Sequence, residues 1–187
     1  EVEKFEKNIS LYCKNKYSVA VNSATSALHI SCLALGLGKG DYLWTSAISF
    51  VASSNCALYC GAKVDFVDID PDTYNLCPKK LEEKLKVAKK EHKLPKILVP
   101  VHLSGQPADL QKIKNLSNKY NFKIIEDASH AIGAEFKGNL IGDCKYSDVC
   151  VFSFHPVKII TSAEGGMALT NNKDTYEKMK ILRTHGI

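Results

Sequence analysis

The sequence lacks several features that define large protein classes. It has no apolar run near the roughly 20 residues that span a bilayer, and no signal peptide at its start. The Gly-x-x-x-x-Gly-Lys-Ser/Thr pattern of phosphate-binding loops is missing. The glycine-rich run Gly36 to Gly40 follows a predicted helix, whereas dinucleotide motifs lie between a strand and a helix. We therefore expect neither a membrane protein nor a nucleotide-binding reductase.

Disulfide and metal-site patterns are also lacking. The seven cysteines are an odd number, scattered mainly in apolar segments, so we expect reduced thiols in a cytoplasmic protein. Cys56 and Cys60 are spaced for one helix face, but no His/Cys pair at metal spacing accompanies them, so no metal site is expected. The net charge of +5 is dispersed, and the densest patch, residues 84–93, is typical of a solvated helix face. A nucleic-acid partner is not expected.

What the sequence does contain is a regular alternation of helices and strands. Of its 187 residues, 45% are apolar and 24% charged, which is typical of one globular domain. The predicted helices cover residues 1–13, 27–37, 50–59, 78–91, 109–120 and 174–183. The predicted strands cover residues 17–21, 42–45, 63–69, 96–103, 122–125, 149–154 and 167–170, with a hairpin at 134–142. This order predicts an α/β fold, a three-layer sandwich with a mostly parallel sheet.

Polar residues gather where the predicted strands end. They comprise residues 23–26, His102, Asp127 and residues 153–158, and the carboxyl ends of parallel strands carry the sites of such sheets. Two acids, Glu126 and Asp127, directly follow one strand. The polar turn at residues 22–26, between a strand and a helix, suits an anion such as phosphate. An ordinary Ser/Thr helix cap explains the same turn equally well.

A pyridoxal phosphate site needs a lysine for the aldehyde, an acid for the ring nitrogen, and hydroxyl and N–H groups for the phosphate. The strand ends offer Lys158, Asp127 and the turn at residues 22–26 for these tasks. A partly desolvated lysine loses its proton more readily and then acts as a nucleophile. Taken singly, Lys158 is more simply explained as a surface lysine, and Asp127 fits a helix cap or loop acid as well as a functional group, so both alternatives stay open on these residues alone.

Six motifs together are more specific than any of their residues. They are NSATSALH at 22–29, HLSGQPADL at 102–110, EDASHAIGAEFKG at 126–138, FSFHPVK at 152–158, EGG at 164–166 and LRTHG at 182–186. In order and spacing, the chain resembles the DegT/DnrJ/EryC1/StrS family of sugar aminotransferases. Within that family it looks most like the transaminases that aminate C4 of a UDP-linked 4-keto-6-deoxy-N-acetylhexosamine on the route to pseudaminic acid.

The resemblance implies a type I PLP-dependent aminotransferase-like large domain over residues 1–187. The family's N-terminal segment and small C-terminal domain would lie outside this chain, and the active site would be completed in a homodimer. Lys158 would form the Schiff base with pyridoxal 5′-phosphate and later move the proton, and Asp127 would pair with the pyridine nitrogen. His130 would contact the 3-hydroxyl of the ring.

The resemblance also implies contacts to the rest of the cofactor. Ala24, through its backbone, Thr25 and Ser153 would hold the phosphate, and Phe50 would stack on the ring. The run from Glu164 to Gly166 matches the loop after the lysine, where glycine permits close backbone approach. For a lone phenylalanine at a helix start, core packing is the simpler interpretation.

The implied reaction has two halves. L-Glutamate would give its amino group to the cofactor, producing the pyridoxamine phosphate form, and the UDP-linked keto sugar would then accept it. Related dehydratases carry histidine in place of the lysine, so Lys158 favours transamination. The alternative is a catalytically incompetent member of the same family that binds the cofactor or a partner and acts as a regulator or assembly module.

Overall fold

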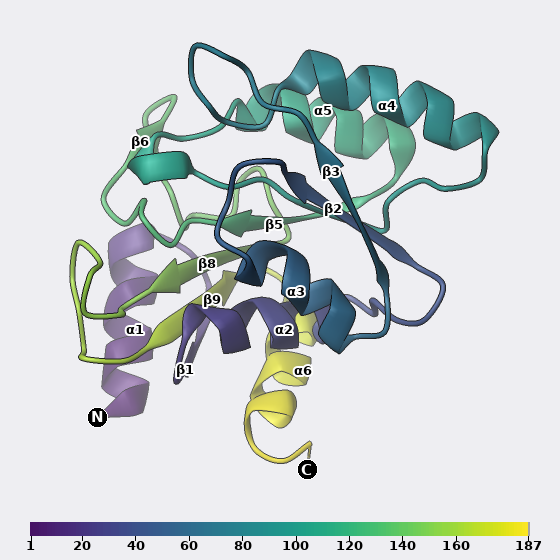
Figure 1. Ribbon diagram of the computed structural model, residues 1–187. Coiled ribbons are helices and arrows are strands. Elements are labelled where there is room, and N and C mark those ends of the chain that lie inside the picture. The colour runs from purple at the N-terminus through teal and green to yellow at the C-terminus, as the bar shows by residue number, and fades with distance from the viewer. Residues whose placement is uncertain (187) are drawn as a thin grey trace.

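The computed structural model describes residues 1–186, so Ile187, the last residue of the expected domain, lies outside it. A seven-stranded sheet forms its centre, in the order β1-β9-β8-β5-β4-β2-β3 (Figure 1). Its strands are β1 (Tyr17–Val21), β2 (Tyr42–Ser46), β3 (Lys63–Val67), β4 (Ile97–Val99), β5 (Lys123–Asp127), β8 (Val149–Ser153) and β9 (Gly166–Thr170). The run from β3 to β8 is parallel, whereas β9 is antiparallel to both β8 and β1. The predicted mostly parallel sheet is therefore confirmed.

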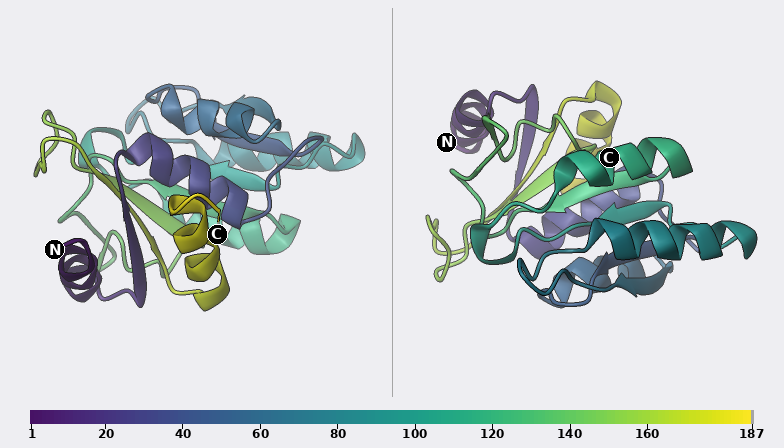
Figure 2. Two further views of the ribbon diagram at one scale, coloured as in Figure 1. Left: turned by 90° about the horizontal axis from the view of Figure 1, so that it is seen from below. Right: turned by 90° about the horizontal axis from the view of Figure 1, so that it is seen from above.

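Helices cover both faces of the sheet. They are α1 (Val2–Cys13), α2 (Ala24–Ala34), α3 (Ala52–Tyr59), α4 (Pro78–Lys90), α5 (Leu110–Tyr120) and α6 (Lys173–Arg183). Helices α2, α3 and α6 lie on one face and α4 and α5 on the other (Figure 2), where α1 also packs through Ile9 and Cys13. This arrangement is the three-layer sandwich that the alternation of elements predicts. A small hairpin, β6 (Glu135–Phe136) and β7 (Asn139–Leu140), occupies the predicted hairpin region.

Strand alternation divides the core into two layers. In β8, Val149 and Val151 pack among α2, α3 and α6, whereas Cys150 and Phe152 face the opposite layer. Successive side chains of a strand point to opposite faces, so a strand buried on both sides reads as a continuous apolar run. This double burial explains why the central strands carry almost no polar residues before their carboxyl ends.

Several predicted boundaries are wrong, each for a local reason. Helix α2 begins at Ala24, three residues before the predicted start, because Ser23 caps it by accepting a hydrogen bond from the Ser26 amide at 3.2 Å. Strand β4 stops at Val99, before Pro100, which has no N–H to donate, and a short 3-10 helix at Leu103–Gly105 replaces the predicted end of the strand. Helix α3 begins at Ala52, which leaves Phe50 in the preceding turn.

All seven cysteines are free thiols, as predicted, and most of them are buried in the core. Within residues 1–186, no group of three or more His, Cys, Asp and Glu side chains is arranged to hold a metal ion. None of the helices in this part of the chain has both the length and the apolar character needed to cross a bilayer.

Candidate active site

A cavity of about 510 Å³ opens at the carboxyl ends of the parallel strands, and the predicted site residues surround it. This volume lies in the range of small-molecule sites. The cavity is lined by the start of α2, the turn before α3, the end of β5 and the loop after β8. All seven predicted site residues are among its walls: Ala24, Thr25, Phe50, Asp127, His130, Ser153 and Lys158. The structure thus brings together residues that lie far apart in the sequence.

Of the two adjacent acids, only Asp127 lines the cavity. Both are predicted to follow the strand, but Glu126 and Asp127 are the last two residues of β5 itself. Because successive strand side chains point to opposite faces, Asp127 lines the cavity and Glu126 points away from it. The sheet geometry therefore selects one of the two carboxylates for the site.

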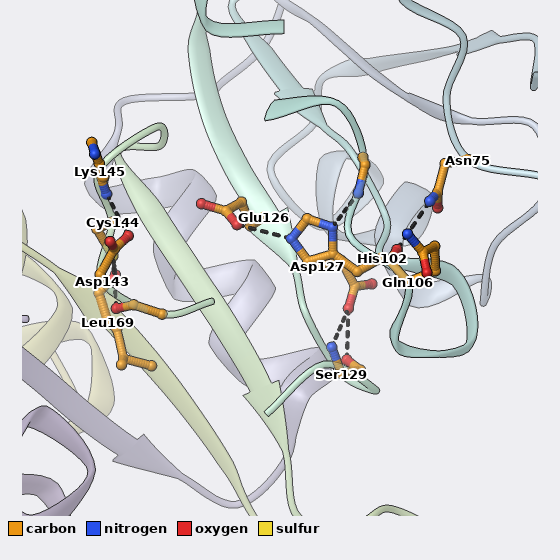
Figure 3. A network of polar contacts seen from close by, with 12 residues as sticks. Asn75, His102, Gln106, Glu126, Asp127, Ser129, Asp143, Cys144, Lys145 and Leu169 are labelled. Atoms are coloured by element: carbon orange, nitrogen blue, oxygen red, sulfur yellow. Dashed lines mark hydrogen bonds and ion pairs between the residues drawn. The ribbon is translucent and has the colours of Figure 1, made fainter. Parts of the chain in front are cut away.

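The Asp127 carboxylate is 4% exposed and is held on both oxygens. Its Oδ1 accepts hydrogen bonds from the amide of Ser129 at 3.2 Å and from the Ser129 hydroxyl at 2.6 Å (Figure 3). Its Oδ2 accepts a 2.5 Å hydrogen bond from the hydroxyl of Ser53 in α3. These donors fix the orientation of the carboxylate and stabilise its negative charge.

Glu126 is paired with His102, which itself lines the cavity. The Nε2 of His102 lies 2.8 Å from Oε2 of Glu126, and the Nδ1 of the same ring accepts a 3.1 Å hydrogen bond from the Ala108 amide (Figure 3). Since Nδ1 is an acceptor, Nε2 carries the ring hydrogen and donates a hydrogen bond to the carboxylate. Both side chains are almost fully buried. The pair secures the segment after β4, whose backbone at His102 also donates to the Asp127 carbonyl at 3.0 Å.

The amino end of α2 forms a second wall. Ala24 and Thr25 are its first two residues, and the N–H groups at these positions have no partner within a helix. Such an end binds anions, phosphate included. Gly166 lies against it so closely that an added Cβ would stand 2.3 Å from the carbonyl carbon of Ser23. The glycine expected from the sequence for close backbone approach is therefore required by packing at this position.

Lys158 lies on an irregular loop between β8 and β9. The base of this loop is closed by backbone hydrogen bonds of Phe154 with Gly165 and Ser162. The Nζ of Lys158 lies 2.7 Å from Nε2 of His130. Burial and the neighbouring ammonium of Lys158 lower the pKa of His130. The neutral ring thus accepts a hydrogen bond from the ammonium group and holds the lysine toward the cavity.

The other predicted residues occupy different parts of the wall. Ser153, at the end of β8, is buried and lines the cavity, and its hydroxyl accepts a 3.5 Å hydrogen bond from the amide of His155 in the lysine loop. Phe50 is 71% exposed and lines the opening of the cavity, so the core-packing alternative for this residue is wrong. Glu164 also lines the cavity, and its carboxylate lies 3.7 Å from His155 Nε2.

The cavity wall fits pyridoxal phosphate in the chemistry of its groups. It offers an amine on Lys158, a buried and hydrogen-bonded carboxylate on Asp127, a helix amino end and the serine Ser153. These are the three kinds of group that the aldehyde, the ring nitrogen and the phosphate require. Ser53 and Ser129 both hold Asp127, although the sequence motifs predict no role for either residue. Ser129 follows Asp127 by two residues in the EDASH motif, a local signal, whereas nothing in the sequence links Ser53 to it.

Comparison with known proteins identifies relatives of the whole chain. It is 44% identical over 187 residues to the UDP-4-amino-4,6-dideoxy-N-acetyl-beta-L-altrosamine transaminase of Campylobacter jejuni, covering all of this chain and 48% of that protein. The structure of PseC from Helicobacter pylori, an aminotransferase of pseudaminic acid biosynthesis, matches 99% of this chain and 48% of that one, with 32% identity and a TM-score of 0.89.

A further solved structure, NtdA from Bacillus subtilis, contains the bound cofactor pyridoxamine phosphate. It matches 96% of this chain and 39% of that one, with 35% identity and a TM-score of 0.85. These likenesses confirm the aminotransferase fold class, whose members use pyridoxal phosphate. The chain spans about half the length of the curated relatives it matches. Because the model of the DegT/DnrJ/EryC1/StrS aminotransferase family matches residues 1–187, the chain belongs to that family.

Proposed function

We propose that this chain is the cofactor-binding large domain of a pyridoxal phosphate-dependent aminotransferase that acts on nucleotide-linked keto sugars. One observation carries the proposal: the amine of Lys158, the carboxylate of Asp127 and the amino end of α2 line the same cavity. Family membership gives the reaction class, and the arrangement of these groups matches the needs of the cofactor. An intact lysine at this position favours transamination over dehydration.

The residues of the chain would divide the work by position. Asp127 would stabilise a positive charge on the ring nitrogen, and the amides of Ala24 and Thr25 with the Ser153 hydroxyl would hold the phosphate. When bound, the cofactor supplies the electron sink that transamination needs. Lys158 would bind the aldehyde carbon and carry the proton at its Nζ, while His130 would orient the lysine and contact the 3-hydroxyl.

The substrate proposal is finer than the family assignment. The transaminase of C. jejuni is named for a UDP-linked amino sugar, and PseC of H. pylori for pseudaminic acid biosynthesis. We propose a UDP-linked 4-keto-6-deoxy sugar aminated at C4 on a pseudaminic acid-type route to flagellin glycan or surface polysaccharide. L-Glutamate is the proposed amino donor. The cytoplasm is the proposed compartment, because it keeps free thiols such as those of this chain reduced.

A homodimer is part of the same proposal. Apolar side chains stand exposed beside the cavity on both of its edges: Phe50 on one, and Val157 (78% exposed) and Ile159 (64%) on the lysine loop. A second copy of the chain packed there would remove apolar surface from water. Light scattering during size-exclusion chromatography should give twice the monomer mass, and a purely monomeric protein would count against the proposal.

The first test is an absorption spectrum of the purified protein with added pyridoxal phosphate. A new visible band is expected in the wild type, unchanged in Lys39→Ala, which removes an exposed lysine outside the cavity, and lost in Lys158→Ala. Adding L-glutamate should then convert the band to the pyridoxamine form, which tests the donor without the sugar. A well-folded wild type without a band would sink the proposal. A band that L-glutamate leaves unchanged would favour the alternative, a cofactor-binding but catalytically incompetent family member.

A further inference from the structure

Within residues 1–186, Ser53 is the one residue of another helix or strand whose side chain donates a hydrogen bond to Asp127. It lies in the first turn of α3, is completely buried, and donates its hydroxyl hydrogen to Oδ2 of Asp127 at 2.5 Å across 74 positions of the sequence. The two bonds to Oδ1 come from Ser129, two residues after the aspartate. They move with the strand end, so they do not fix the carboxylate relative to the opposite wall of the cavity.

The backbone of Ser53 also makes a hydrogen bond to the cavity wall, at the turn before α3. Its amide donates a 3.1 Å hydrogen bond to the carbonyl of Phe50, which lines the cavity opening together with Ala52. One residue is therefore bonded to the acid through its hydroxyl and to the turn that carries Phe50 through its amide. The spacing between these two parts of the wall depends on Ser53.

The hydrogen-bonding capacity of the carboxylate leaves room for one ligand group. An ionised carboxylate has about four acceptor sites, and the Ser53 hydroxyl, the Ser129 amide and the Ser129 hydroxyl occupy three of them. The remaining site is available to a donor inside the cavity. A hydroxyl bond to a buried carboxylate is short and strong, so it also determines which way this last site points.

We propose that Ser53 is a positioning residue, which aims the free acceptor site of Asp127 at the ring nitrogen of the cofactor. It also fixes the distance between the Asp127 carboxylate and Phe50, the residue proposed to stack on the ring. This inference rests on the proposed function, because it concerns the same cavity and the same cofactor. It assigns to Ser53 no contact with the cofactor itself.

Pyridoxamine 5′-phosphate is the appropriate probe, because it carries the ring nitrogen but no aldehyde that reacts with Lys158. Calorimetric titration should show binding to Ser53→Ala weakened about tenfold or more, since a hydrogen bond to a charged group is lost. Ser53→Thr keeps a hydroxyl and should recover most of the affinity. The matched control is Ser31→Ala, another completely buried helical serine, whose hydroxyl bonds to the Ala27 carbonyl; its affinity should stay within about twofold of the wild type.

Thermal unfolding of each ligand-free variant separates positioning from folding. Comparable unfolding temperatures in Ser53→Ala and Ser31→Ala, with only the former weakened in binding, would support the inference. Unchanged affinity in Ser53→Ala, equal weakening in Ser31→Ala, or no recovery in a folded Ser53→Thr would overturn it while leaving the proposed function intact. A folded wild type that binds neither form of the cofactor would overturn both.

Discussion

The acid and the lysine of the cavity are held in opposite ways. Asp127 ends a central strand, is 4% exposed and accepts hydrogen bonds from Ser53 and Ser129. Lys158 lies on an irregular loop, and its neighbours Val157 and Ile159 are largely exposed. Its side chain is hydrogen-bonded to His130, which is itself exposed. The acid side of the cavity is thus built into the core, whereas the lysine side depends on a loop at the surface.

Because of this difference, substitutions on the two sides of the cavity should affect stability to different extents. A substitution on the sheet side removes partners from buried donors and affects folding, whereas a substitution on the loop changes little except the reacting group. The loop also exposes apolar residues to water. In the proposed homodimer, the second subunit would cover these residues and so fix the position of the loop.

The largest effect is expected for the two central residues themselves. Lys158→Ala and Asp127→Ala should each lower transaminase activity by at least about 10³-fold. Their stabilities should differ: Asp127→Ala should cost about 2 kcal/mol of unfolding free energy, because the Ser53 hydroxyl loses its acceptor in a buried place. Lys158→Ala should stay within about 0.5 kcal/mol of the wild type. Urea denaturation measures both values, and equal losses would break the contrast.

Much of the fold follows from local sequence patterns. The apolar runs of β5 and β8 predict strands buried on both sides, and the periodic stripe of Leu110, Ile113 and Leu116 predicts α5. The orientation of β9 does not follow, because an antiparallel strand at residues 166–170 has the same apolar pattern as a parallel one. The start of a helix is also hard to predict where several possible capping residues lie close together, as at Ser23 and Ser26. Which of them caps the helix depends on where the preceding strand ends and how the chain leaves it.

The candidate site divides in the same way. Lys158, Asp127 and the turn before α2 could be predicted, because strand ends of a parallel sheet meet at one edge and family motifs mark the residues. Ser53 could not, because its bond to Asp127 depends on how α3 packs against the sheet rather than on any spacing in the sequence. Nor could the sequence show that Glu126 turns away to pair with His102. Sequence therefore indicates the candidate reacting groups, and the fold indicates the residues that hold them.

The next largest effect is expected at Gly166, on the sheet side. In Gly166→Ala the new Cβ would meet backbone atoms of Ser23 and Ala24 at 2.3 to 2.5 Å, so β9 or the start of α2 has to shift. We expect a loss of about 3 kcal/mol in unfolding free energy and weaker binding of pyridoxamine phosphate. The matched control is Gly38→Ala, where no atom lies within 4 Å of the added Cβ; its stability should change by less than about 0.5 kcal/mol. Similar denaturation midpoints for the two variants would show that the packing at Gly166 is not needed.

The smallest effect concerns pH and the loop side. Burial and the Lys158 ammonium lower the pKa of His130 below its ordinary value of 6.5. The unfolded chain then takes up a proton at higher pH than the folded chain does. The stability that the neutral ring contributes is therefore fully present above about pH 6.5 and is lost as the pH falls through the lowered pKa. Because the ring is largely exposed, solvent screening should limit the change to a few tenths of a kcal/mol.

Burial also lowers the pKa of His29, but His29 is present in both wild type and His130→Asn. The difference between the two proteins therefore isolates the contribution of His130. The difference in unfolding free energy between wild type and variant should shrink as the pH is lowered from 8 to 5. A difference that stays constant would show that the ring does not titrate differently in the folded state. Protonation also replaces the hydrogen bond to Lys158 with repulsion between two cations, so acid should release the lysine while the buried bond between Ser53 and Asp127 persists. Acid would then loosen the lysine loop before the sheet side of the site changes.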